Sequence, residues 1–150
     1  MEHFKFEQDF VEDNVRCIPM VVRFKLDACG VKLKLAEWST FSASERTMLA
    51  MTPCNTYDNV MRYREHLRLL VWKHTGSEAT PLSVDENPLW SILSRIPDML
   101  LAKLQELGAR ISLQQWQSLS DLQRFALIKL SAAKHEQKNF PKALKEFNLF

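Results

Sequence analysis

The sequence predicts an all-α fold built from two related helical units, and three observations support this prediction. Residues Ile18–Leu49 and Ile96–Leu127 align without a gap at an offset of 78, with ten of 32 positions identical. Apolar residues recur at helical spacing along both copies. The three glycines of the chain each follow such a helical stretch, where glycine takes the left-handed conformation that ends a helix.

Each copy begins with an Ile-Pro pair and a helix that ends at a glycine. The pattern predicts helices over Pro19–Cys29, before Gly30, and over Pro97–Leu107, before Gly108. Each proline has two possible roles. It starts its helix, where its missing N–H does no harm, or it lies inside a longer helix and kinks it. The next residues alternate between apolar and polar, which predicts a very short two-stranded ribbon that pairs residues 31–35 with 109–113.

Two further helices are predicted in each copy. A short turn of helix carries Trp38 or Trp116, and the sequences Ser42–Glu45 and Ser120–Gln123 are capping boxes that open the next helix. A long helix, Tyr57–Thr75, closes the first half, and a short one, Pro141–Phe147, closes the second.

The predicted organisation is a single domain over residues 1–150 with an internal repeat. The first repeat covers about 14–75, the linker 76–87, and the second repeat about 88–150, with about three to four helices in each repeat. Neither repeat alone can bury its apolar stripe, so we expect the two to pack face to face about a pseudo-twofold axis.

Composition narrows the class of protein. No apolar run reaches the roughly 18 residues of a membrane span, and the acidic N-terminus lacks the pattern of a signal peptide. Three cysteines, an odd number, favour a reducing cytoplasm. No spacing typical of a metal site and no known catalytic motif is present in the sequence, so we expect a cytoplasmic, non-enzymatic protein without a cofactor.

Residues that both copies share are expected to form the scaffold. Trp38 and Trp116 are therefore predicted to be core residues. Four shared cations leave two interpretations open: their stems cover the core and their charges meet water or carbonyls, or they bind a small anionic ligand. These cations are Lys25, Lys103, Arg46 and Arg124.

The three cysteines all lie in the first half of the chain. Cys29 lies on the core stripe of its helix, whereas Cys17 follows Arg16, a cation that favours the thiolate. Cys17 is therefore either an inert thiol or a redox and sulfur-ligand candidate. A third function, nucleic-acid binding through the basic helix Tyr57–Thr75, is the least favoured because nothing marks a recognition helix.

Three stretches of the chain resemble the conserved nitrate reductase-associated protein family of small, mainly cyanobacterial and bacterial proteins. They read FKFEQDFVEDNVRCIPMVVRFKLDACGVKLKLAEWSTFSASER, ISLQQWQSLSDLQRFALIKL and KNFPKALKEF. The resemblance implies an accessory or chaperone-like role in the expression or maturation of assimilatory nitrate reductase, a molybdenum-cofactor enzyme. It supplies no catalytic residue.

The family-like block at the N-terminus is also the predicted partner surface. Interfaces favour aromatic residues, methionine and arginine, and this block combines them. The expected partner is nitrate reductase or its cofactor-delivery machinery, while the oligomeric state is not readable from the sequence. The surface comprises Phe6, Glu7, Asp9, Phe10, Arg16, Cys17, Met20 and Arg23.

Overall fold

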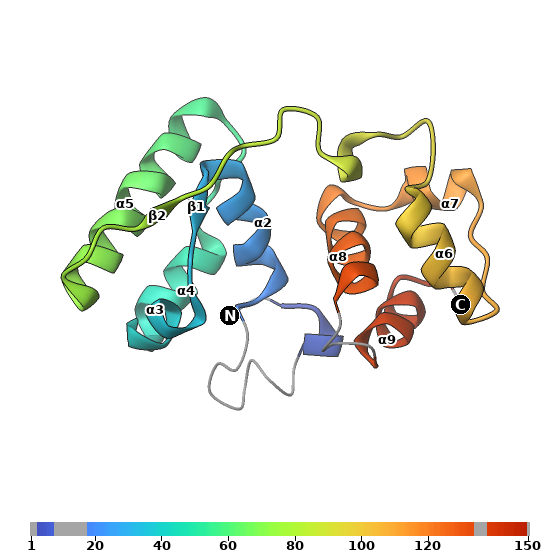
Figure 1. The fold of residues 1–150 in the computed structure, drawn as a ribbon, viewed down its shortest axis with the longest axis horizontal. Coiled ribbons are helices and arrows are strands. Elements are labelled where there is room, and N and C mark those ends of the chain that lie inside the picture. The colour runs from blue at the N-terminus through green and yellow to red at the C-terminus, as the bar shows by residue number, and fades with distance from the viewer. Residues whose placement is uncertain (1–2, 8–17, 134–137, 150) are drawn as a thin grey trace. The chain divides into compact units, whose positions relative to one another are not determined.

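The computed structural model describes residues 3–7, 18–133 and 138–149, which fall into two compact units, Met1–Asp85 and Glu86–Phe150. The described elements of the first unit are η1 (Lys5–Glu7), α2 (Met20–Cys29), β1 (Val31–Lys32), α3 (Leu35–Thr40), α4 (Ala43–Met51), α5 (Tyr57–Thr75) and β2 (Thr80–Pro81) (Figure 1). Those of the second unit are η2 (Leu89–Ser91), α6 (Asp98–Glu106), α7 (Leu113–Ser118), α8 (Asp121–Ala132) and α9 (Asn139–Glu146). The predicted helical character is confirmed.

The Ile-Pro pairs start helices rather than kink them. Pro19 is the N-cap of α2 and Pro97 is the N-cap of α6, so neither proline removes a hydrogen bond from a helix interior. The predicted glycine stops are also confirmed, since Gly30 and Gly108 have φ angles of 75° and 67°. Gly30 also allows close packing, because a β-carbon there would lie 2.9 Å from the carbonyl oxygen of Leu82.

Capping boxes set the start of the next helices in both units. The backbone N–H of Glu45 donates to Ser42 Oγ at 3.1 Å in α4, and Gln123 makes the same 3.1 Å bond to Ser120 in α8. The paired helices begin 78 residues apart: α2 and α6 at Met20 and Asp98, α3 and α7 at Leu35 and Leu113, α4 and α8 at Ala43 and Asp121. The predicted pseudo-twofold packing of the two units stays a prediction.

The predicted ribbon between residues 31–35 and 109–113 is wrong. β1 instead pairs antiparallel with β2, with Val31 opposite Pro81 and Lys32 opposite Thr80. The Leu82 N–H extends this pairing by donating to the carbonyl of Gly30 at 2.9 Å. The expected partner segment, residues 109–112, forms no strand and leads into α7. Part of the predicted linker therefore belongs to the first unit.

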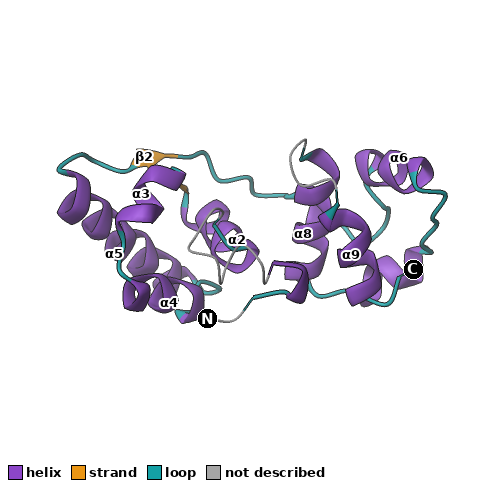
Figure 2. Cartoon of the chain, turned by 90° about the horizontal axis from the view of Figure 1, so that it is seen from below, coloured by secondary structure: helices purple, strands orange, loops and turns teal. Residues whose placement is uncertain are grey.

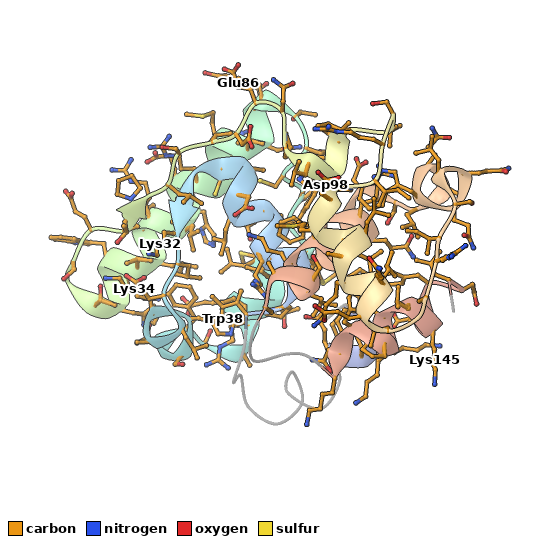
Figure 3. The ribbon with its side chains drawn as sticks, turned by 45° about the vertical axis from the view of Figure 1, so that its right-hand side comes forward. Lys32, Lys34, Trp38, Glu86, Asp98 and Lys145 are labelled. Atoms are coloured by element: carbon orange, nitrogen blue, oxygen red, sulfur yellow. The ribbon has the colours of Figure 1, made fainter. Side chains whose placement is uncertain are left out.

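The core of the first unit lies between α5 and the helices that it covers. α5 packs against α2 and α3 (Figure 2). It buries Tyr63, Leu67 and Val71 on one face. The Tyr63 hydroxyl donates to the carbonyl of Leu49 at 2.8 Å, so its polar atom is satisfied inside the core. Trp38 is buried, as predicted, whereas Lys32 and Lys34 extend outward from the preceding segment (Figure 3).

The second unit is organised around α8. This helix contacts η2, α6 and α9 and buries Phe125, Leu127 and Leu130. Trp116 is fully buried, which confirms its predicted core role. None of the helices in the described ranges combines the length and the apolar character needed to cross a bilayer.

Candidate binding surface

The two described cysteines are buried thiols. Cys29 Sγ lies 3.7 Å from the carbonyl oxygen of Leu26, and Cys54 Sγ lies 3.8 Å from that of Lys25. Burial raises the pKa of the Cys29 thiol to about 12, and burial also raises the pKa of Cys54. A thiolate is the reactive and metal-binding form, so neither side chain is suited to redox chemistry or ligation. Cys17 lies outside the described residues.

The shared lysines contact groups within their own units. Lys25 Nζ donates to the carbonyl of Ala50 at 2.6 Å, close to the C-terminal end of α4, where free carbonyls favour a cation. Lys103 Nζ lies 3.3 Å from a carboxylate oxygen of Glu106, one helical turn along α6. Both contacts match the interpretation that these stems cover the core and place the charge on polar groups.

The shared arginines lie over the shared tryptophans. The guanidinium carbon of Arg46 is 5.9 Å from the ring centroid of Trp38, and Arg124 lies at the same distance from Trp116. Arg46 Nε also donates to the carbonyl of Trp38 at 3.3 Å and Nη2 to that of Ser39 at 3.1 Å. Arg46 is thus engaged at the end of α3, while Lys25 is engaged at the end of α4, so these two cations of the first unit do not converge on one site.

Arg124 is more deeply buried than Arg46 and donates hydrogen bonds to more groups. It is only 5% exposed, and its Nε donates to the carbonyl of Trp90 at 2.7 Å. Its terminal N–H groups donate to the carbonyl of Leu119 and to the carboxylate of Asp121. These contacts leave little of the guanidinium for an anionic ligand.

Trp38 and Trp116 differ in one hydrogen bond that the sequence repeat does not predict. Trp116 Nε1 donates to the carbonyl of Ile92 at 3.0 Å, while the buried Nε1 of Trp38 has no acceptor among the described residues. The Gln117 side chain donates to the carbonyl of Leu93 at 2.9 Å, so the segment before α6 is held by side chains of α7 and α8.

The described part of the predicted partner surface is largely buried. Phe6, Glu7 and Met20 are all buried, and Arg23 is half-buried with Nη1 3.7 Å from Met20 Sδ. Asp9, Phe10, Arg16 and Cys17 lie outside the described residues. Glu7 makes a structural contact, since its carboxylate accepts from the N–H of Met20 at 2.9 Å and so caps the start of α2.

Glu7 gives the fold a specific pH dependence. Burial raises the pKa of its carboxyl from 4.5 to about 7, although the N–H groups of Met20 and Phe4, and then the nearby His3 and Arg23, lower it. Because the folded-state pKa lies above the unfolded one, stability is lost as the pH rises from about 4.5 to 7. We expect the free energy of unfolding of the wild type, measured by urea denaturation, to include a loss of about 2 kcal/mol from Glu7 between pH 5 and pH 8. Glu7→Gln keeps an acceptor but cannot ionise, so this loss should be absent from the variant. A pH profile parallel to that of the wild type would contradict this role.

An ion cluster that sequence reasoning missed joins the start of α4 to the end of α5. Glu45 Oε1 accepts from the Ser42 N–H at 2.8 Å and lies 2.9 Å from His74 Nε2, and Lys73 Nζ lies 3.4 Å from Oε2. The Ser42 N–H is the largest cause that lowers the pKa of Glu45, to about 2, and His74 adds to it. The capping box was the available signal for Glu45, but its partners depend on the tertiary fold.

The concave features of the described structure are weak candidates for a ligand site. Within the described ranges, no group of three His, Cys, Asp or Glu side chains is arranged to hold a metal ion. An open hollow of about 340 Å³ in the second unit is lined by amides such as Gln114, Gln115 and Asn148, together with Phe147. None of the residues predicted to bind a ligand lines it.

Exposed apolar side chains give the clearest candidate surface. Met48 and Met51 are 50% and 63% exposed, and they lie one turn apart on the same side of α4. We name these two residues the α4 methionine face. The outer side of α5 adds four more exposed apolar residues, namely Tyr57, Met61, Leu69 and Trp72. The sequence carries these residues at helical spacing, but their exposure depends on which helix face meets the core.

Comparison with known proteins places the chain in a family. A family model described as conserved nitrate reductase-associated protein matches residues 3–147 of the 150-residue chain. No curated protein and no solved structure matches the chain significantly.

Proposed function

Because the chain belongs to the conserved nitrate reductase-associated protein family, we propose that it is a non-enzymatic accessory protein that binds nitrate reductase or its cofactor-delivery machinery. In this proposal it acts during expression or maturation of the assimilatory, molybdenum-cofactor enzyme. The contribution of the chain is recognition of a protein surface, and the chemistry belongs to its partner.

The exposed α4 methionine face is the observation that carries this proposal. Methionine side chains are flexible and polarizable, and they are common where one surface adapts to a protein partner. The side chains of Met48 and Met51 are both more than a third exposed, so they do not belong to the apolar core of their unit and are available to a partner. By contrast, the shared cations contact carbonyls and carboxylates of their own units, which favours a protein partner over a small anion.

A pull-down with purified nitrate reductase tests the proposed surface. We expect Met48→Glu/Met51→Glu to lower recovery of nitrate reductase at least about tenfold, since interface hot spots contribute 1–2 kcal/mol or more each. The matched control is Met99→Glu, an exposed methionine on α6 of the second unit, which should bind like the wild type. Equal recovery with all three proteins would contradict the assignment to α4.

The N-terminal surface predicted from the sequence is a second arm of the same experiment. Arg16→Glu/Arg23→Glu reverses its two cations and leaves α4 unchanged. We expect recovery to stay near the wild-type level, because Phe6, Glu7 and Met20 are buried. A loss confined to this variant would place the interface on the N-terminal surface instead.

A further inference from the structure

The outer side of α5 carries a stripe of four exposed residues at the spacing of a coiled-coil seam. Met61, Glu65, Arg68 and Trp72 follow one another at intervals of four, three and four residues. All four are exposed, with Trp72 at 56%. We name them the α5 stripe. The opposite face of the helix holds the buried residues that pack on the core, so among the described residues of the first unit the stripe faces away from the core.

The α5 stripe has the same character when it is read in either direction. In both directions the order of residue types is apolar, charged, charged, apolar, and the two central charges are opposite in sign. In an antiparallel pair of α5 helices centred between Glu65 and Arg68, each Glu65 therefore faces Arg68 of the second copy. Each Met61 faces Trp72 of the second copy, a sulfur–aromatic contact that is favourable in proteins.

Charge selects this arrangement over the parallel one. A parallel pair in register places Glu65 against Glu65 and Arg68 against Arg68, and like charges in contact are strongly disfavoured. Within one chain, Arg68 Nη1 lies 3.1 Å from Glu65 Oε1, and both side chains are about half exposed. Such an exposed pair contributes little by itself. In the antiparallel pair, each charge gains a second partner of opposite sign, which fixes the orientation of the pair more than it adds to the affinity.

The position and length of α5 also suit such pairing. The helix has 19 residues and lies on the outer side of the first unit in both views (Figures 1 and 2). At 1.5 Å per residue it is about 28 Å long, and it offers three turns of continuous stripe. Leu69, also exposed, borders the stripe and widens its apolar area.

We propose that the α5 stripe is a self-association surface on which two copies of this chain pair through antiparallel α5 helices. The occupant is a second copy because the stripe is complementary to itself in sequence order and in charge. This inference does not depend on the proposed binding of nitrate reductase, which uses the α4 methionine face.

Sedimentation equilibrium across protein concentrations, with a charge swap, tests this inference. We expect the wild type to form dimers and the single variants Glu65→Arg and Arg68→Glu each to weaken dimerisation at least tenfold. The double variant Glu65→Arg/Arg68→Glu restores opposite charges at both contacts, so its dissociation constant should return to within about threefold of wild type. Circular dichroism of each variant confirms that the helices are retained.

Three results would overturn the inference. They are a wild type that stays monomeric at every concentration, single variants that dimerise like the wild type, and a double variant that fails to recover. Loss of dimerisation in Trp72→Ala, with Leu101→Ala on α6 of the second unit as an exposed control away from α5, gives an independent measure of the apolar contact. Equal effects of these two substitutions would also count against the α5 stripe.

Discussion

Trp116→Ala is expected to destabilise the second unit by about 3–5 kcal/mol, the usual range for truncation of a buried tryptophan. The Trp116 side chain is fully buried, it lies beneath Arg124, and its indole N–H satisfies the carbonyl of Ile92. The substitution removes the packing and the hydrogen bond together. Urea denaturation followed by circular dichroism measures the free energy of unfolding.

A pair of phenylalanine variants separates packing from hydrogen bonding. Trp116→Phe leaves the carbonyl of Ile92 without its donor, whereas Trp38→Phe removes an N–H that has no acceptor among the described residues. We expect Trp116→Phe to be the more destabilising of the two by about 1 kcal/mol. A larger loss for Trp38→Phe would show that the indole N–H of Trp38 has an acceptor in solution.

Arg124→Met is expected to lower the free energy of unfolding by about 3 kcal/mol, because it leaves buried acceptors without donors. Arg124 joins η2 and the end of α7 to α8 through the carbonyls of Trp90 and Leu119, and it also pairs with Asp121. Methionine keeps much of the stem but supplies no N–H group. Urea denaturation at neutral pH measures the loss.

Arg46→Met is the matched control in the first unit. Arg46 is half-buried and donates to the carbonyls of Trp38 and Ser39, which water can partly reach. We expect a loss of about 1 kcal/mol there. Equal losses at the two positions would contradict the conclusion that Arg124 is the more deeply engaged residue.

Local signals in the sequence predict the helices well. The long helix Tyr57–Thr75 has the predicted bounds, because Thr56 caps its start and Gly76 takes a φ of 70° at its end. The Ser42 and Ser120 capping boxes likewise set the starts of α4 and α8. A cap acts within one turn of the chain, so it can be recognised without tertiary information.

Contacts between distant segments could not be predicted in the same way. Two-residue strands carry almost no pattern, so nothing in the sequence distinguished Thr80–Pro81 from residues 109–113 as the partner of Val31–Lys32. The same reason explains the candidate site. Glu7 is buried and Met48 is exposed because of how the chain packs. From the sequence alone, a surface position is equally compatible with either residue.

The measurement that tests the accessory role most directly is nitrate reductase activity per nitrate reductase polypeptide in cells that lack this chain. We predict that the polypeptide accumulates with reduced activity, that the wild-type chain restores the ratio, and that Met48→Glu/Met51→Glu does not. An unchanged ratio of activity to polypeptide, together with an unchanged amount of the polypeptide, in the absence of the chain would contradict the proposed function.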